Sequence, residues 1–277
     1  MTREKFQELI AIQCYSKSTK KIYEFHIGNF LKMYSNPIQE NILDYLKYLV
    51  MIKKYSPSSL NLAKYSLIYY FKDVLQQKIM VYIPKIKRAK SLPKVVDKEI
   101  IFSMVDITKN LKHRIVLEML YSSGIRLGEI VKSKWEDVDF QNKILRINNG
   151  KGNKDRITIL SNKVIDDLKK YNDERYNKIN PYIFDSLQKP HTHISCKTVQ
   201  KIVKNTLKKL GINLKISPHS FRHSFATNLV EKDVNIRKIQ TMLGHSNLNT
   251  TNLYTRVAKK DLLNIQNPMD DYIQSEV

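Results

Sequence analysis

Residues 143–160 read KILRINNGKGNKDRITIL, and this stretch decides the class of fold. Its two ends, KILRIN (143–148) and RITIL (156–160), are rich in isoleucine and leucine and predict two short strands. The segment NGKGNKD between them has the glycine and asparagine of a tight turn, so we expect the strands to pair in antiparallel fashion. Most of the other patterned segments have helical periodicity. We therefore expect a mainly α (α+β) protein with a small antiparallel β-sheet.

Helical periodicity dominates the first third of the chain. Apolar residues recur at helical spacing over about 18–34, 38–49 and 60–74, and Ser56-Pro57-Ser58-Ser59 is expected to begin and cap the last of these helices. The apolar positions of the first segment are Ile22, Phe25, Ile27, Phe30 and Leu31. This pattern predicts an N-terminal helical bundle with lysine-rich outer faces.

A domain boundary is expected within PKIKRAKSLPKVVD (84–97), which has two prolines, five basic residues and no helical periodicity. We assign residues 1–87 to the helical domain, 88–96 to a linker and 97–277 to a second domain. In the second domain Asp97 can cap a helix that begins KEIIFSM. Another helix is expected from about Leu111 to Ser122 and ends before Gly124.

The charge of the chain points to a polyanionic partner. The 277 residues include 48 Lys and Arg against 26 Asp and Glu, a formal net charge of +22. The excess is shared along the chain, because residues 1–87 hold 14 basic and 6 acidic residues. DNA or RNA is the expected partner, and basic residues in both domains suit a protein that surrounds a duplex. A general bias toward lysine, as in thermophilic or AT-rich genomes, is the alternative.

Cysteine content and hydropathy indicate a soluble, cytoplasmic protein. Cys14 and Cys196 lie far apart, as in a reduced compartment, and no apolar run approaches the roughly 18 residues of a membrane span. We therefore expect no membrane partner.

Two segments could bind a phosphate. His219 and Arg222 are three residues apart in a helix that begins at Ser217-Pro218, where free backbone N–H groups attract anions and Arg adds planar donors. In YSSGIRLGEI, Arg126 follows the helix stop at Gly124, and Glu129 can hold its guanidinium. Taken alone, each segment is better explained by the simpler alternative: a solvent-facing helix start for His219 and Arg222, and an ordinary hinge with a surface ion pair for Arg126.

Two further segments complete the set. Lys151 lies between glycines at the tip of the predicted hairpin, a turn that lacks the spacing of a P-loop and could be merely a solvated basic turn. In LGHSNLNTTNLYTRV, His245 follows Gly244 at a helix end and Tyr254 comes nine residues later. Tyr254 is one of 16 tyrosines, so only its conjunction with the other residues is informative.

The ordered set R…K…H-x-x-R…G-H…Y resembles the catalytic signature of the tyrosine recombinase (phage integrase) family. It is carried by SSGIRLGE (122–129), GKGNKDR (150–156), HSFRHSFAT (219–227) and MLGHSNLNTTNLYT (242–255). Within the family the chain most resembles the Xer-type recombinases that resolve chromosome dimers, with which its length, two-domain layout and linker SLPKVVDKEI (91–100) agree. The resemblance covers nearly the whole chain and is most specific from about 115 to 260.

The resemblance implies a role for each residue. Tyr254 is the expected nucleophile, which forms a 3′-phosphotyrosyl bond with DNA. The other expected catalytic residues are Arg126, Lys151, His219, Arg222 and His245, supported by Glu129 and His223. Separately, we expect DNA contacts from Lys85, Lys87, Arg88, Lys90, Lys154 and Arg156.

No metal or nucleotide cofactor is expected. Two arginines, a lysine and histidines supply what divalent ions supply in metal nucleases, and ATP is unnecessary because the phosphotyrosyl bond conserves the energy of the phosphodiester. His191, His193 and Cys196 could bind a metal, but they lack a fourth ligand nearby, so we interpret this stretch as a basic loop facing DNA. The expected partners are a double-stranded recombination site and three further copies of the chain, in a tetramer on two sites. A paralogue or a DNA translocase could also take part. In such a tetramer the tail after Tyr254 could pass to a neighbouring copy.

Three alternatives remain open at this stage. An integrase of a virus or mobile element would use the same chemistry at a different site, and a type IB topoisomerase would share the chemistry without pairing two sites. A DNA-binding regulator is the alternative from another class, because residues 218–243 could form a helix-turn-helix motif.

Overall fold

The computed structural model describes residues 3–12, 15–86, 95–148, 155–175, 178–186, 188–189, 191–244 and 267–271. The chain divides into two units, residues 1–91 and 92–277. The first contains helices only, and the second combines helices with one small sheet in the described residues, which confirms the expected fold class. None of the helices in these ranges is long and apolar enough to cross a membrane.

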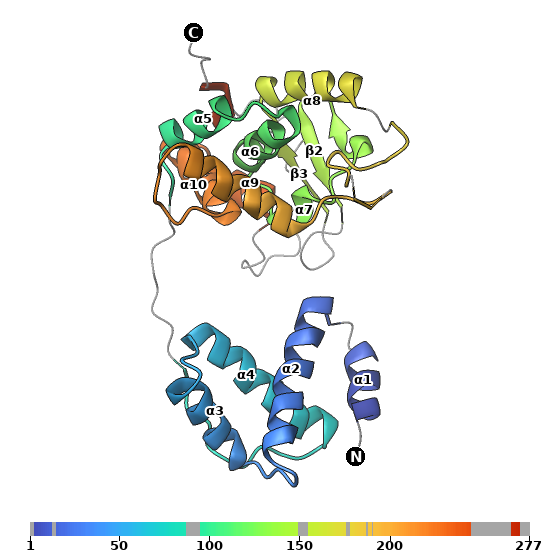
Figure 1. The fold of residues 1–277 in the computed structure, drawn as a ribbon, viewed down its shortest axis with the longest axis vertical. Helices are drawn as coiled ribbons and strands as arrows, with labels where there is room; N and C mark the ends of the chain where they lie inside the picture. Colours follow the sequence, from blue (N-terminus) through green and yellow to red (C-terminus); the bar gives the residue numbers. More distant parts are fainter. Residues whose placement is uncertain are drawn as a thin grey trace. The chain divides into compact units, whose positions relative to one another are not determined.

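The first unit is a helical bundle, drawn in blue to cyan in Figure 1. It consists of α1 (Arg3–Ile12), α2 (Lys17–Met33), α3 (Asn41–Met51), α4 (Pro57–Tyr69) and the π-helical turn η1 (Tyr70–Val74). Ser56 caps α4 as expected, since its hydroxyl accepts the backbone N–H of Ser59. Helix α2 packs against α4 around a core that includes Phe30 and Phe71.

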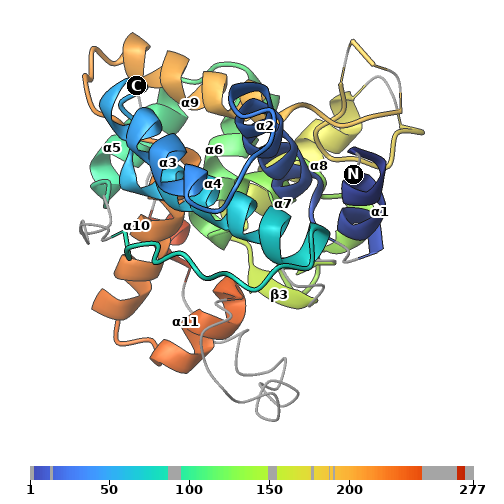
Figure 2. The same ribbon diagram turned by 90° about the horizontal axis from the view of Figure 1, so that it is seen from below.

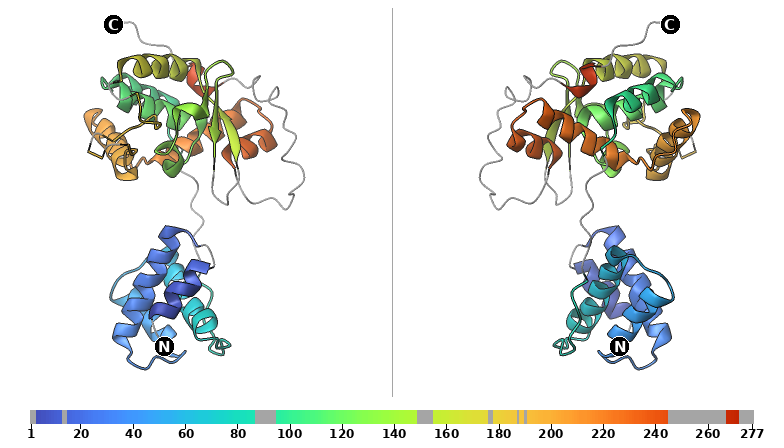
Figure 3. Two further views of the ribbon diagram at one scale, coloured as in Figure 1. Left: turned by 90° about the vertical axis from the view of Figure 1, so that its right-hand side faces the viewer. Right: turned by 90° about the vertical axis from the view of Figure 1, so that its left-hand side faces the viewer.

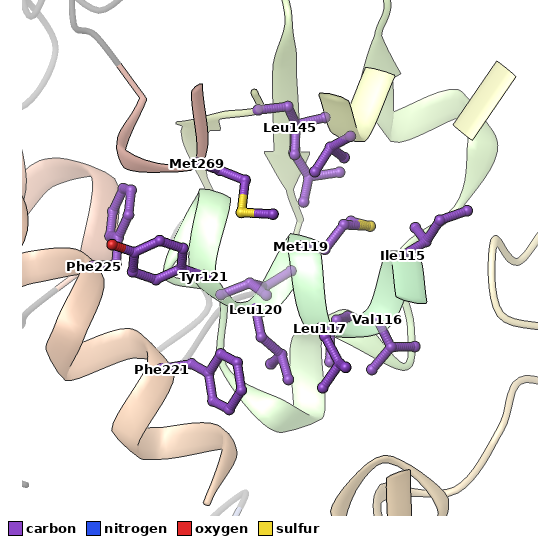
Figure 4. Close-up of a cluster of buried hydrophobic side chains, with 14 of the residues drawn as sticks. Ile115, Val116, Leu117, Met119, Leu120, Tyr121, Leu145, Phe221, Phe225 and Met269 are labelled. Carbon is purple, nitrogen blue, oxygen red and sulfur yellow. The ribbon is translucent and has the colours of Figure 1, made fainter. Parts of the chain in front are cut away.

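The second unit is built around α6 (Leu111–Ser123), whose residues 115–123 are all buried. It is surrounded by α5 (Lys98–Asp106), α8 (Asn162–Glu174), α9 (Cys196–Lys209) and α10 (Pro218–Glu231), as Figure 1 shows. Figure 4 shows Phe221 and Phe225 of α10 directed toward α6, where both are fully buried. These two phenylalanines fix α10, and therefore the side chain of Arg222 between them.

The sheet has three antiparallel strands in the order β1 (Val138–Asp139), β2 (Ile144–Ile147) and β3 (Arg156–Ile159). Strands β2 and β3 confirm the predicted hairpin and pair Ile144 with Ile159 and Ile147 with Arg156. The turn at 149–154 lies outside the described residues. Helix α11 (Ile236–Leu243) packs against β3 and α10, and the views of Figures 2 and 3 show it beside the sheet. The remaining described elements are α7 (Leu127–Ile130), η2 (Trp135–Asp137) and η4 (Pro268–Asp271).

Three expectations of detail were wrong. Phe25 and Leu31 of α2 are exposed although they recur at helical spacing, because the buried stripe runs instead through His26, Ile27 and Phe30. Asp97 precedes α5 as expected, but its side chain makes no capping hydrogen bond.

The described part of the tail returns to its own unit. Met269 is fully buried in the core, and the Asn267 side-chain amide donates to the carbonyl oxygen of Ser122 at 2.8 Å. Leu262, Leu263 and Ile265, the apolar residues considered for exchange with a neighbouring copy, lie outside the described residues. Residues 267–269 therefore pack on α6 of the same chain.

Gly124 ends α6 in the left-handed conformation, with φ of 58°. A Cβ atom at this position would lie 2.5 Å from Cδ1 of Phe225 and 2.7 Å from Cδ2 of Leu243. We expect Gly124→Ala to lower the free energy of unfolding by about 3 kcal/mol, since it combines left-handed strain with overpacking. Urea unfolding measures this loss, and Gly128→Ala, whose added Cβ meets no atom within 4 Å, is the control. Equal losses in both variants would contradict the steric explanation.

The buried carboxyl group of Glu118 makes the stability of the second unit depend on pH. Its side chain is completely buried on α6, with Lys163 Nζ at 3.7 Å and Arg114 Nε at 3.8 Å from its carboxylate. Burial, and then the negative charge of Asp167, raise the pKa of Glu118 to about 8. Because this folded-state pKa lies above the unfolded value, the contribution of Glu118 to stability is complete below about pH 4.5 and is lost as the pH rises toward 8.

We expect Glu118→Gln to remove this loss. The difference in unfolding free energy between the variant and the wild type should shift in favour of the variant by about 4 kcal/mol between pH 4.5 and 8. Urea unfolding across this pH range measures the shift, with Glu99→Gln on the exposed surface of α5 as the control. A difference that does not change with pH would show that the pKa of Glu118 in the folded protein equals that in the unfolded chain, which would contradict the effect of burial.

Candidate active site

Arg126 lies at the start of α7, directly after the chain has turned at Gly124. Its backbone N–H donates to Oε2 of Glu129 at 2.9 Å, and its guanidinium Nη1 donates to Oε1 of the same carboxylate at 2.9 Å. Nη2 donates to the carbonyl oxygen of Gly244 at 2.7 Å. The sequence expectation that Glu129 holds the Arg126 guanidinium is confirmed.

Arg222, on α10, also binds a carbonyl oxygen at the end of α11. It is 4% exposed, and its Nη1 donates to the carbonyl oxygen of Gly124 at 2.6 Å while Nη2 donates to that of Leu243. Arg126 and Arg222, 96 positions apart in sequence, therefore bind the carbonyls of the adjacent residues Gly244 and Leu243 at the end of α11.

Arg156, the first residue of β3, forms a cluster with Arg126, Arg222 and Glu129. Its Nη1 and Nη2 donate to the two oxygens of Glu129 at 2.9 and 2.6 Å, and its Nε donates to the carbonyl oxygen of Met242 at 2.8 Å. The carbonyls of Met242, Leu243 and Gly244 are thus each bound by a different arginine. The C-terminus of a helix carries partial negative charge, which suits this arrangement.

The cluster has an excess of positive charge. Burial on its own would raise the pKa of Glu129, but the hydrogen bonds and charge of Arg156, and then those of Arg126, outweigh it and lower the pKa to about 2. Burial, and then repulsion from Arg126 and Arg156, lower the pKa of Arg222 to about 9. Three guanidinium groups face one carboxylate, so a phosphate entering the cluster would relieve their repulsion.

His219 and His223 lie one helical turn apart on α10. Their ring centroids are 5.5 Å apart with an interplanar angle of 79°, an edge-to-face contact. Burial, and then the nearby His219 and Arg222, lower the pKa of His223 and favour its neutral form. His219 is exposed, so a substrate could exchange a proton with it.

The structure brings together Arg126, Glu129 and Arg222, with His219 and His223 on the same helix as Arg222. Lys151, His245 and Tyr254 lie outside the described residues, but Gly244, which is bound by Arg126, directly precedes His245 in sequence. Among the expected DNA contacts, Lys85 is exposed. Four of the other expected DNA contacts lie outside the described residues: Lys87, Arg88, Lys90 and Lys154.

Arg156 was expected to contact DNA because it follows a basic turn in the sequence, but in the structure its side chain is almost completely buried. Its side chain is 6% exposed, and Nε, Nη1 and Nη2 each donate to a group of the protein. The sequence offers no signal for this burial, because Arg156 follows a basic turn and Thr158, the residue on the same face of β3, is polar. In the structure Thr158 is fully buried. Its hydroxyl donates to the carbonyl oxygen of Ser123, at the end of α6.

The stretch considered as a metal site forms other contacts. His193 Nδ1 lies 2.7 Å from the carbonyl oxygen of Ile194, and Cys196 begins α9 with its thiol 3.9 Å from the carbonyl oxygen of Leu127. Across the residues that are described, no three His, Cys, Asp or Glu side chains gather in the manner of metal ligands.

Comparison with known proteins identifies the family. Residues 94–261 match the Phage integrase family, and residues 2–80 match the Phage integrase, N-terminal SAM-like domain. The chain belongs to the phage integrase family of tyrosine recombinases. It is therefore an enzyme of the site-specific DNA recombinase class, and the family resemblance seen in the sequence is confirmed.

The relatives cover nearly the whole chain. Tyrosine recombinase XerA of Pyrococcus horikoshii is 35% identical over 262 residues, which cover 94% of this chain and 90% of that protein. A crystal structure of XerA recombinase is 28% identical with a TM-score of 0.52 and covers 94% of both chains. The integrase of the transposon Tn1549, in complex with circular intermediate DNA, has a TM-score of 0.67 at 18% identity, over 94% of this chain and 96% of the integrase. This last likeness concerns the fold alone.

Proposed function

We propose that the chain cleaves and rejoins DNA at specific sites through a 3′-phosphotyrosyl intermediate with Tyr254 as the nucleophile. The observation that carries this proposal is the convergence of Arg126 and Arg222 on adjacent carbonyls at the end of α11. Two guanidinium groups so close together can bind both nonbridging oxygens of one phosphodiester. The chain continues from this point directly to His245 and on to Tyr254.

In the cleavage step the oxygen of Tyr254 forms a bond to phosphorus while the bond from phosphorus to the 5′-oxygen breaks. The Tyr254 proton passes to His219, and Lys151 donates a proton to the departing 5′-oxygen. Arg126 and Arg222 stabilise the charge that grows on the nonbridging oxygens, and His245 adds a hydrogen bond. The 5′-hydroxyl of another strand then attacks the phosphotyrosyl bond and releases Tyr254.

Glu129 and His223 act on these groups without touching the phosphate. Glu129 fixes Arg126 through both its guanidinium and its backbone N–H. His223, whose pKa is lowered by burial, stays neutral beside Arg222 and the ring of His219. We propose that no metal ion or nucleotide is required. The arginines and Lys151 supply the positive charge that metal ions supply in other phosphoryl-transfer enzymes, and the phosphotyrosyl bond conserves the energy needed for rejoining.

Both units are proposed to bind the recombination site on double-stranded DNA. The net charge of +22 is spread over both, and the linker segment contributes Lys85, Lys87, Arg88 and Lys90. Lys154 is a further candidate, in the turn that also contains Lys151. Phosphate contacts of this kind make affinity fall steeply with salt concentration.

The proposed biological role is that of an Xer-type recombinase, which resolves chromosome dimers at a dif-like site in the cytoplasm as a tetramer on two DNA sites. The support is the similarity to proteins named XerA over nearly the full length. A paralogue or a DNA translocase remains a candidate partner. The alternative role, as the integrase of a virus or mobile element, shares every proposed catalytic residue.

Sequencing of trapped DNA distinguishes these roles. Covalent protein–DNA complexes are isolated from host cells after denaturation, and the attached DNA is sequenced, with Tyr254→Phe cells as the background. DNA from one locus near the replication terminus supports the Xer role. DNA from the ends of a mobile element supports the integrase role, and DNA from many unrelated loci indicates a topoisomerase-like activity.

A further inference from the structure

Arg156 connects three parts of the candidate site that belong to different elements. From β3 it binds both oxygens of Glu129 on α7 and the carbonyl oxygen of Met242 on α11. The guanidinium thus joins the carboxylate that fixes Arg126 to the helix end that Arg126 and Arg222 also bind. With 6% of its side chain exposed, Arg156 differs from Arg126, whose side chain is 22% exposed.

Among the described residues, Arg156 does more than any other cation to keep Glu129 ionised. Burial opposes its ionisation, and the largest opposing contribution comes from Arg156, ahead of that from Arg126. Arg222 on α10 also interacts with Glu129, while α11 contributes backbone carbonyls at this point. Without Arg156 a neutral Glu129 would become accessible at higher pH, and a neutral carboxyl binds Arg126 less strongly.

The end of α11 is packed closely against the same side chain. Gly244 has φ of 62°, and a Cβ atom placed on it would lie 2.8 Å from Cδ and 3.2 Å from Nε of Arg156. Since Arg156 is fixed by its bonds to Glu129 and Met242, it has little freedom to move away. The contact therefore defines the position of Gly244 at the end of α11.

We propose that Arg156 is a positioning residue for DNA cleavage: it holds the Glu129 carboxylate and the end of α11 in the arrangement that Arg126 and Arg222 require. This inference rests on the proposed function of the site. Because Nε, Nη1 and Nη2 of Arg156 each bind a group of the protein, we expect its loss to affect the rate of cleavage rather than the affinity for DNA.

Three variants test the proposal. Arg156→Gln removes the charge and the bridge. Arg156→Lys keeps the charge but offers a single ammonium that cannot reproduce the planar fork. Arg114→Gln is the matched control, because Arg114 also binds a carboxylate through two nitrogens, to Asp167 at 3.0 and 3.1 Å. It lies ten residues before Gly124 on α6, a helical rise of about 15 Å from the site.

Amide hydrogen exchange on the DNA-free protein tests the positioning of α11 directly. The backbone N–H of Gly244 donates to the carbonyls of Gln240 and Thr241 in the last turn. We expect Arg156→Gln to increase exchange in this turn by about tenfold, because a charge-assisted hydrogen bond to its end is lost. Arg114→Gln should leave this turn at its wild-type rate under conditions where both variants are fully folded, because the end of a helix exchanges through local opening.

Single-turnover cleavage of a nicked duplex carrying the recombination site tests the consequence for function. At saturating DNA we expect Arg156→Gln to cleave about 100-fold more slowly than the wild type, as for a misplaced catalytic group, with Arg156→Lys between the two. The decline of the rate toward acidic pH should begin at higher pH in Arg156→Gln than in Arg156→Lys or the wild type. The salt dependence of binding should stay at its wild-type slope.

The outcomes separate this proposal from the proposed function. Faster exchange in α11 with slow cleavage and an unchanged salt slope supports positioning. Unchanged exchange contradicts it. A salt slope reduced by about one, with wild-type cleavage once bound, also contradicts it and identifies Arg156 as a phosphate contact. If the wild type itself forms no covalent complex, the proposed function fails, and the exchange measurement alone decides whether Arg156 holds the end of α11.

Discussion

Tyr254→Phe is expected to lower the rate of covalent complex formation with DNA by about 10⁴-fold or more, the scale seen when a nucleophile is removed. Phenylalanine keeps the ring but lacks the oxygen that would bond to phosphorus. Affinity for DNA should be retained, since binding is attributed to the basic residues of both units. The measurement is accumulation of an SDS-stable complex on a nicked duplex in EDTA, together with a binding isotherm on the same DNA.

Tyr171→Phe is the control for this experiment. The Tyr171 hydroxyl is in the same unit and donates to Asp185 at 3.2 Å, so its loss should cost about 1 kcal/mol of stability and leave cleavage intact. A Tyr254→Phe protein that still forms the complex at the wild-type rate would mean that another residue is the nucleophile.

Arg222→Gln is expected to lower the cleavage rate at saturating DNA by about 10²–10³-fold, as for the removal of one donor that stabilises a transition-state oxyanion. Glutamine offers one amide in place of a charged, planar group. It also cannot replace the bonds of Arg222 to the carbonyls of Gly124 and Leu243, so the variant should be less stable. Single-turnover kinetics on protein checked for folding by circular dichroism gives the rate.

The stability loss in Arg222→Gln needs to be separated from the chemical effect. Arg114→Gln loses a bidentate carboxylate contact in the same unit, so it provides the loss of a partly buried, hydrogen-bonded guanidinium away from the site. It should cleave at close to the wild-type rate at a temperature where both variants are folded. Equal losses of rate in the two variants would attribute the effect to folding and not to a role of Arg222 in catalysis.

The elements that were predicted are those with strong local signals. The isoleucine- and leucine-rich segments 143–148 and 156–160 predicted β2 and β3, and Gly124 marked the end of α6. Helices α8 and α9 were not predicted, although Ser161 and Ser195 cap them. Their buried residues, such as Val164 and Leu168, recur at helical spacing, so the signal was present in the sequence.

Other features depend on contacts between distant residues. The exposure of Phe25 follows from the way α2 packs in its bundle, which spacing within one helix does not specify. The short strand β1 is part of the sheet because it pairs with β2, where Val138 lies opposite Leu145.

The candidate site was predicted from the family signature and not from geometry. Local sequence did suggest the Arg126–Glu129 pair, because the two residues are three apart. The convergence of Arg126, Arg156 and Arg222 on the last carbonyls of α11 requires α7, β3 and α10 to meet there. No local pattern contains that information, which is why Arg156 was expected to face DNA.

Identification of the amino acid that carries the DNA tests the central claim most directly. The SDS-stable complex is digested with nuclease and trypsin, and the peptide that retains a nucleotide is sequenced by mass spectrometry. Cleavage after Lys238 and Arg256 yields the peptide 239–256, in which Tyr254 is the one tyrosine. We predict a nucleotide joined through its 3′-phosphate to Tyr254. A nucleotide on a serine or threonine of this peptide, or on any other peptide, would contradict the account.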